Sequence, residues 1–243
     1  MLEENKYSDK DFTPDHSSLD WLDMDERELS DYAWLEWARA QDIFPGKSLF
    51  GDGISPDDID QGGLGNCWFL AAISAIAEKP GRMEKVFLQK ENYLNQAGIY
   101  GFNFFTLGVP HTVVIDDYLP VETDSRGKKG TVFTSIGDDS SLWGPLIEKA
   151  FAKYWGNYGH IVGGASQMAV RTMLGGVHMS HDHASMTIDQ IWEILHENAQ
   201  TDTILTAGSN GESDEHKNTS GLVEGHAYTI LKTVILSNKA KLV

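Results

Sequence analysis

The sequence predicts an α+β fold, because it contains segments typical of buried helices as well as pairs of segments typical of strands. With 243 residues, of which 41 % are apolar and 10 % aromatic, the chain can bury a substantial hydrophobic core. Small and large apolar residues are mixed over residues 66–78, as in a buried helix. Aromatic and β-branched residues dominate residues 98–105 and 111–116, as in strands. The composition and both patterns therefore predict a globular α+β chain.

The predicted elements follow one another with recognisable start and stop signals. The first helix, over residues 66–78, has Asn66 as a suitable N-cap and ends where Pro80 prevents its continuation. The strands over 98–105 and 111–116 come next. The remaining predicted elements are helices over residues 142–154 and 188–198 and a strand pair formed by residues 203–206 and 226–231.

The charge is strongly negative and unevenly distributed. The formal net charge is −17, and residues 1–31 hold eleven Asp or Glu against three Lys or Arg. Such a block predicts a solvated acidic arm over residues 1–45, outside the core. The overall charge would repel a nucleic-acid backbone and an anionic membrane, so neither is expected as a partner.

A single cysteine and the hydropathy pattern indicate the compartment. One cysteine cannot form an intramolecular disulfide framework. The sequence has neither an apolar leader near its start nor a run of about 18 apolar residues that could span a membrane. We therefore expect a reducing, cytoplasmic location.

Cys67 is either an inert buried residue or a nucleophile. It lies at the start of the first predicted helix, where free backbone N–H groups and the helix dipole stabilise a thiolate. The glycine-rich residues 62–65 before it allow close approach of the backbone to a substrate. Gln61 could donate a hydrogen bond to a developing oxyanion together with the Cys67 amide.

His226 is the best candidate for a general base among the nine histidines. It begins an apolar predicted strand, which would hold its imidazole rigidly. A cysteine at the start of an early helix and a histidine on a strand 159 residues later is the arrangement of papain-like proteases. From these two residues alone, a purely structural role for Cys67 stays equally open.

Several segments together resemble a known family. Residues 61–72 resemble the nucleophile segment of calpains, the calcium-dependent cysteine endopeptidases of papain-like fold. The other resembling segments follow in the family's order: a strand and turn over 113–120, a long helix over 142–153, Gly163-Gly164, and a histidine segment over 221–228.

The resemblance implies a role for each matching site residue. Cys67 would be the nucleophile of an endopeptidase acting on intracellular proteins, His226 the general base and Gln61 the oxyanion donor. Gly164 and Gly225 would line the cleft and bind the substrate backbone, with Trp68 beside the nucleophile. Recognition of extended main chain would permit many substrate sequences.

The resemblance also implies two subdomains, of which the second is incomplete. Residues 46–178 would form the cysteine-bearing half and residues 179–243 the start of the β-rich, histidine-bearing half. The family's third catalytic residue is an Asn in an Asn-Pro-Trp segment beyond the histidine, but the sequence ends 17 residues after His226. We therefore expect a C-terminally truncated chain with a less firmly oriented imidazole. The alternative function is a catalytically weak peptide-binding or regulatory module.

Two groups of residues are candidate metal sites. The resemblance implies a calcium ion held by the Gly53 carbonyl and the Asp58 carboxylate, but Ser141 stands where the family has a Glu. One carboxylate fewer predicts weak Ca²⁺ binding. Residues 178–183 contain three histidines and one Asp, which either ligate a metal or form a polar loop. The polar loop is the favoured interpretation.

Overall fold

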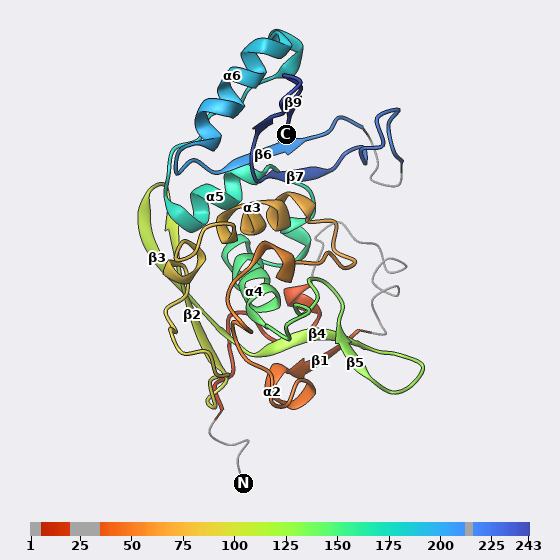
Figure 1. Cartoon of the computed structure of the whole chain (residues 1–243). Coiled ribbons are helices and arrows are strands. Elements are labelled where there is room, and N and C mark those ends of the chain that lie inside the picture. The colour runs from red at the N-terminus through yellow and green to blue at the C-terminus, as the bar shows by residue number, and fades with distance from the viewer. Residues whose placement is uncertain (1–5, 20–34, 212–215) are drawn as a thin grey trace.

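The computed structural model describes residues 6–19, 35–211 and 216–243. Helices lie at the centre of the molecule, and small antiparallel sheets lie around them (Figure 1). The α+β class predicted from the sequence is confirmed. Within the described residues, no helix is both long and apolar enough to cross a membrane.

The central helix is α3 (Cys67–Ala77), which is buried along nearly its whole length. It packs against α5 (Ser166–Leu174), and α4 (Trp143–Trp155) lies beside them in the middle of the molecule. Helix α5 ends at Gly175, whose φ of 70° is the left-handed conformation typical of a helix C-terminus. Helices α3 and α4 match the predicted segments within a residue or two, whereas α5 was not predicted.

Two sheets flank the helices. Strands β2 (Ile99–Thr106) and β3 (Val109–Asp116) form a hairpin in which Phe102 pairs with Val113. Alternate residues of β2 face the helices, as the predicted strand pattern requires. The other sheet has the order β1-β4-β5 and is built from β1 (Glu36–Arg39), β4 (Tyr118–Thr123) and β5 (Lys129–Thr131).

The histidine-bearing half contains one helix and two short hairpins. Helix α6 (Ile188–Ala199) begins with a capping box between Thr187 and Gln190. Strands β6 (Leu205–Gly208) and β7 (Ala227–Ile230) pair antiparallel, which confirms the predicted strand pair. Strands β8 (Val234–Ile235) and β9 (Lys241–Leu242) form the second hairpin.

Short helical turns connect these elements. They are η2 (His16–Ser18), α2 (Ala40–Ile43), η3 (Pro56–Asp58), η4 (Met83–Lys85), η5 (Gly159–Ile161) and η6 (His183–Ser185).

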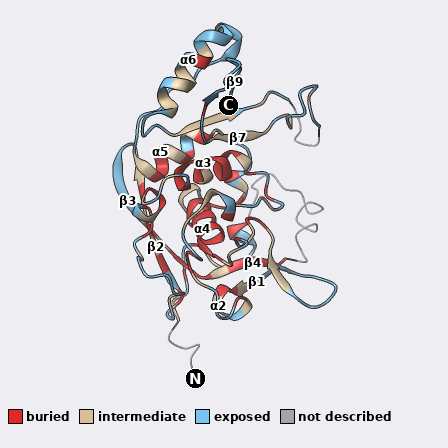
Figure 2. Cartoon of the chain, viewed as in Figure 1, coloured by how far each residue is buried: buried red, intermediate tan, exposed pale blue. Residues whose placement is uncertain are grey.

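The hydrophobic core belongs almost wholly to the first half of the chain. Its large, fully buried side chains include Phe69, Phe102, Trp143 and Phe151, and the rings of Phe69 and Phe151 stack with centroids 4.5 Å apart. Figure 2 shows the buried residues concentrated on α3, α4 and the neighbouring strands, whereas α6 and the C-terminal hairpin are mostly intermediate or exposed. The cysteine-bearing half therefore provides the rigid part of the molecule.

The predicted acidic arm is only partly described, and its described part is not a solvated tail. Residues 1–5 and 20–34 lie outside the described residues. Asp9 and Phe12 are almost fully buried, and Lys153 donates to the Asp9 carboxylate at 2.6 Å. The prediction of a solvated segment therefore does not hold for Asp9 and Phe12, because the partly exposed Lys153 neutralises the Asp9 carboxylate and the Phe12 ring belongs to the core.

Candidate active site

The start of α3 presents free backbone donors next to Cys67. Asn66 occupies the N-cap position, but its side chain does not cap the helix. The Phe69 amide bonds to the Asn66 carbonyl at 2.9 Å, whereas the Cys67 and Trp68 amides find no acceptor within the described part of the chain. Cys67 itself is a free, partly exposed thiol. Uncapped N–H groups at a helix start favour negative charge, so this position suits a thiolate or an oxyanion.

The glycine-rich segment before Cys67 is held against residues 132–135. The Gly63 amide donates to the Val132 carbonyl at 3.0 Å, and the Ser135 amide donates to the Asp60 carbonyl at 3.1 Å. A side chain at Gly62 would collide with the Phe133 carbonyl, so glycine is required there. Gln61 lies between these anchors with its residue partly exposed, as a donor facing a substrate must be.

Trp68 and Gly164 form one wall beside the nucleophile. The Trp68 indole N–H donates to the Ile161 carbonyl at 2.9 Å, and the Gly163 amide donates to the Gly65 carbonyl at 3.2 Å. A Cβ on Gly164 would lie only 2.5 Å from the indole ring. The structure thus brings the predicted pair Trp68 and Gly164 into direct contact next to Cys67.

His226 immediately precedes β7, and its backbone is fixed by Ser209. The His226 amide donates to the Ser209 hydroxyl at 3.0 Å, and the Ser209 amide donates to the His226 carbonyl at 2.9 Å. Gly225, before it, adopts a φ of 57°, a left-handed conformation that favours glycine. The Asn210 carbonyl accepts from the Gly225 amide at 3.4 Å.

Helix α3 and strand β7 pack against each other. The Thr229 hydroxyl donates to the Ala71 carbonyl at 2.8 Å. A small cavity is lined by Ala75 of α3, by Glu78 directly after this helix, and by Ile230 of β7.

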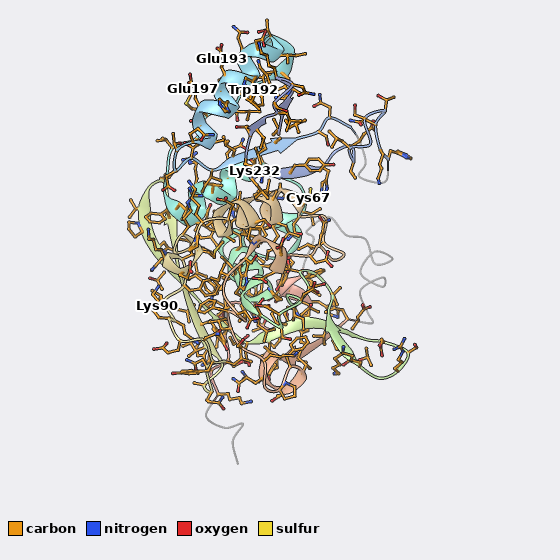
Figure 3. All side chains as sticks on the ribbon, in the orientation of Figure 1. Cys67, Lys90, Trp192, Glu193, Glu197 and Lys232 are labelled. Atoms are coloured by element: carbon orange, nitrogen blue, oxygen red, sulfur yellow. The ribbon has the colours of Figure 1, made fainter. Side chains whose placement is uncertain are left out.

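Each of the two predicted catalytic residues lies at the start of one of these packed elements. Cys67 lies four residues before Ala71, about 6 Å along a helix. His226 lies three residues before Thr229, about 10 Å along a strand. Figure 3 shows Cys67 at one end of α3, of which it is the first residue. The two residues therefore lie on adjoining elements, and their pairing in catalysis stays a prediction.

The His226 ring is partly supported. It contacts the Tyr228 ring edge to face, with centroids 5.1 Å apart, and the Tyr228 hydroxyl accepts from the Val223 amide at 2.8 Å. Its Nδ1 atom is buried and has no hydrogen-bond partner within the described ranges. Such an atom requires a partner if the ring is to keep one orientation and tautomer.

Two residues near the start of α3 were not predicted from the sequence. Glu148 contacts the Asn66 side chain, and Thr134 contacts Glu148. Glu148 is fully buried on α4, and its carboxylate accepts from the Asn66 side-chain amide at 2.8 Å and from the Thr134 hydroxyl at 2.6 Å. Burial raises the pKa of Glu148 to about 6, although the hydrogen bonds from Thr134 and Asn66 oppose this shift. One signal was available: Glu148 and Lys149 are charges in a helix that is otherwise apolar over residues 142–151.

The residues predicted to hold calcium supply only part of a calcium shell. Asp58, at the end of η3, is largely buried, and one of its carboxylate oxygens already accepts from the Ser55 amide and from the Trp143 indole N–H. Burial raises the Asp58 pKa, which disfavours the charged form that calcium needs. Gly53 lies in an exposed turn with a φ of 142°. Among the described residues, no three His, Cys, Asp or Glu side chains form a group able to hold a metal.

This donor set does not fit the six to eight oxygen ligands that calcium usually takes. The histidine-containing residues 178–183 form an exposed loop in which the Asp182 carboxylate accepts from the Ala184 amide at 2.9 Å. A polar loop is the interpretation that agrees with this local capping role.

Comparisons with known proteins agree with this site. The family model for calpain family cysteine proteases matches residues 7–243. A calpain-type cysteine protease, ADL1, of Oryza sativa subsp. japonica is 34 % identical over 241 residues, which cover 94 % of this chain and 11 % of the relative. Calpain of Schistosoma mansoni is 32 % identical and covers 94 % of this chain and 29 % of its own length. Calpain-14 of Homo sapiens is 34 % identical over 81 % of this chain and 28 % of its own length.

The chain thus spans between about a tenth and a third of the length of these curated relatives. The family match includes both the Cys67 segment and the His226 segment, and it confirms the papain-like α+β fold that the resemblance implied. The chain belongs to the calpain family of cysteine proteases.

Proposed function

We propose that this chain is a cysteine endopeptidase that cleaves proteins through a thioester on Cys67, with His226 as the general base. The observation that supports the proposal is the α3–β7 contact, because Cys67 begins one of these packed elements and His226 immediately precedes the other. Family membership supports a peptidase as the reaction class.

Acylation begins with attack of the Cys67 sulfur on a peptide carbonyl carbon. His226 takes the thiol proton, and the carbonyl oxygen becomes an oxyanion. The Cys67 amide, which is free at the start of α3, and the side-chain amide of Gln61 would donate hydrogen bonds to that oxygen. The carbon–nitrogen bond then breaks, and His226 gives its proton to the leaving amine.

In deacylation, water is the nucleophile and the Cys67 sulfur is the leaving group. Water attacks the thioester carbon, His226 accepts one of its protons, and the second oxyanion forms at the same position. Collapse of this intermediate releases the carboxylic acid and returns the proton to the Cys67 sulfur. The chemistry requires only these groups and water.

The substrate would bind as an extended chain. Gly164 lies close to the Trp68 indole, Gly225 precedes the proposed base, and both glycines are exposed, so they offer backbone without side chains. Their amide and carbonyl groups can pair with the substrate main chain, which every protein offers. We therefore expect broad specificity for unfolded protein segments.

The test is cleavage of an unfolded protein, with new N-termini read by mass spectrometry, by the wild type and by Cys67→Ser. The wild type should generate peptides, and the Cys67→Ser variant should lose activity by a factor of about 10⁴ or more. Equal cleavage by both proteins would exclude Cys67 as the nucleophile.

A second candidate is a peptide-binding module with little turnover. The buried His226 Nδ1 without a hydrogen-bond partner in the described part favours it, because a free ring can adopt the wrong tautomer. This candidate predicts that wild type and Cys67→Ser bind an unfolded peptide with the same Kd and that neither cleaves it. Cleavage by the wild type in the experiment above rules it out.

Calcium binding at Gly53 and Asp58 stays a prediction from the resemblance. With one carboxylate, already hydrogen-bonded to Trp143, we expect weak binding that Asp58→Ala abolishes. Asp57→Ala, which changes the exposed neighbouring carboxylate, is the matched control. Calorimetric titration with calcium chloride measures both. Unchanged affinity in Asp58→Ala would remove Asp58 from the site.

We further propose a reducing compartment such as the cytoplasm as the place of action. Cys67 is a partly exposed thiol, and the mechanism needs it unoxidised.

A further inference from the structure

Glu148 is a fully buried carboxylate that the proposed reaction does not use. It accepts three hydrogen bonds, from the Asn66 side-chain amide at 2.8 Å, the Thr134 hydroxyl at 2.6 Å and the Thr134 backbone amide at 3.0 Å. All three donors are neutral, and the adjacent Lys149 pairs with Asp116 instead. Burying a carboxylate without a cation is costly, so a role beyond packing is worth considering.

The contact with Asn66 changes what this residue does at the start of α3. An Asn at the N-cap position usually accepts a hydrogen bond from the second or third amide of the helix through its side-chain oxygen. Here the side chain instead donates to Glu148 and leaves the helix uncapped. Asn66 has φ −107° and ψ 34°, which differ from the extended backbone common at N-caps.

The alternative, a capped helix, would be harmful next to a nucleophile. A capping oxygen of Asn66 would lie at the helix start, beside the amides of Cys67 and Trp68. It would take up the Trp68 amide and set a partial negative charge close to the Cys67 amide, where the oxyanion forms. A side chain that is turned away from the helix start therefore keeps this position available to an anion.

We propose that Glu148 is a positioning residue: by holding the Asn66 side chain, it keeps the first amides of α3 free for the oxyanion that forms beside Cys67. The inference rests on the proposed function. It adds a residue 82 positions from Asn66 in the sequence, on a different helix, that acts only through Asn66.

The experiment compares two reactions of the same sulfur. Peptide hydrolysis passes through an oxyanion, whereas alkylation of Cys67 by iodoacetamide is a displacement at a saturated carbon and forms none. Glu148→Met removes every acceptor at nearly constant volume, so we expect kcat for peptide hydrolysis to fall roughly a hundredfold with little change in KM. The rate constant of iodoacetamide alkylation should change by less than about threefold.

Three further variants make the comparison specific. Glu148→Gln keeps a carbonyl oxygen that can accept from Asn66, so it should recover most of the lost kcat. Thr134→Val removes one donor to Glu148 but leaves the contact with Asn66, so its kcat should stay within about threefold of the wild type. Asn66→Ala removes the other partner of the same contact. In the double variant with Glu148→Met, kcat should fall no further than in either single variant.

Each outcome has one meaning. If Glu148→Met lowers hydrolysis and alkylation by the same factor, Glu148 serves only the folded structure and the inference is overturned. The same holds if kcat is unchanged in Glu148→Met, or if the losses from Asn66→Ala and Glu148→Met add. If the wild type neither cleaves peptides nor reacts with iodoacetamide faster than free cysteine, it is the proposed function that fails.

Discussion

The two halves that meet at α3 and β7 are packed very differently. The cysteine-bearing half has a continuous core in which Phe69 and Phe151 stack and Trp143 is fully buried. In the histidine-bearing half, Trp192 is the only hydrophobic residue among the described ones to be classed as buried, and the strands are two to four residues long. The proposed nucleophile thus lies on a rigid element, whereas the proposed base immediately precedes a strand that packs against the first half.

Charge pairs show the same contrast. Lys149 and Asp116 form a fully buried ion pair in the first half, and the Asp9 amide also donates to Asp116 at 2.8 Å. In the second half, Lys241 and Asp189 pair at 2.9 Å with both side chains exposed. The first half can therefore hold its site residues in place without the second half. The orientation of His226, in contrast, should be sensitive to mild changes at the interface between the halves.

The largest expected effect comes from breaking the buried pair. Lys149→Met leaves the Asp116 carboxylate without its cation in the core, so the free energy of unfolding should fall by about 3–5 kcal/mol. Lys241→Met, the matched change in the second half, should cost at most about 1 kcal/mol. Urea unfolding of both variants measures the difference, and equal losses would contradict the contrast between the halves.

A smaller effect concerns the pH dependence of stability. Burial raises the pKa of Glu148 from 4.5 to about 6 in the folded protein. Because the folded-state pKa is the higher one, the folded protein binds the extra proton, and stability is lost as the pH rises through about 6. This shift corresponds to about 2 kcal/mol.

Glu148→Gln cannot ionise and should escape that loss. Its free energy of unfolding relative to the wild type should therefore rise by about 2 kcal/mol between about pH 4.5 and pH 7. Glu197→Gln, at an exposed position of α6, is the control and should show no such trend. A pH-independent difference between Glu148→Gln and the wild type would show that Glu148 titrates normally.

The smallest effect is expected at the interface between the halves. Asp202, just before β6, accepts from Arg82 at 2.5 Å and from Lys79 at 3.3 Å, both of which follow α3. Asp202 is exposed, so its pairs are screened by salt. Asp202→Asn should slow Cys67 alkylation by less than about fivefold at low ionic strength and hardly at all in about 1 M salt. Glu193→Gln on α6 is the exposed control, and a salt-independent effect would argue against an electrostatic contact.

The sequence predicted the elements whose signals are local. Helices α3, α4 and α6 and the β2–β3 and β6–β7 pairs follow from apolar patterning, Pro80 and the strand-forming residues. Strand β1 could not be predicted, because it is four residues long and pairs with β4, about 80 residues away. The burial of Asp9 was missed for a similar reason, since the Lys153 that neutralises it lies 144 positions away.

The site residues also divide into those with a local sequence signal and those without one. Cys67, the glycines before it and His226 were predicted from neighbouring residues and from the resemblance. The support of Asn66 by Glu148 and of His226 by Ser209 arises only when distant segments pack, and a Ser in a polar loop carries no local signal. Side chains that react can therefore be recognised in the sequence more readily than side chains that hold them.

The most direct test of a Cys67–His226 pair is the pH profile of iodoacetamide alkylation, followed by mass spectrometry of the Cys67 peptide, for the wild type and His226→Ala. We expect the wild type to react at about pH 6.5 at least tenfold faster than free cysteine, because an imidazolium beside the sulfur stabilises the thiolate. The His226→Ala variant should lose most of this advantage. A wild-type profile that superimposes on that of free cysteine and is unaffected by His226→Ala would contradict the pairing of Cys67 with His226.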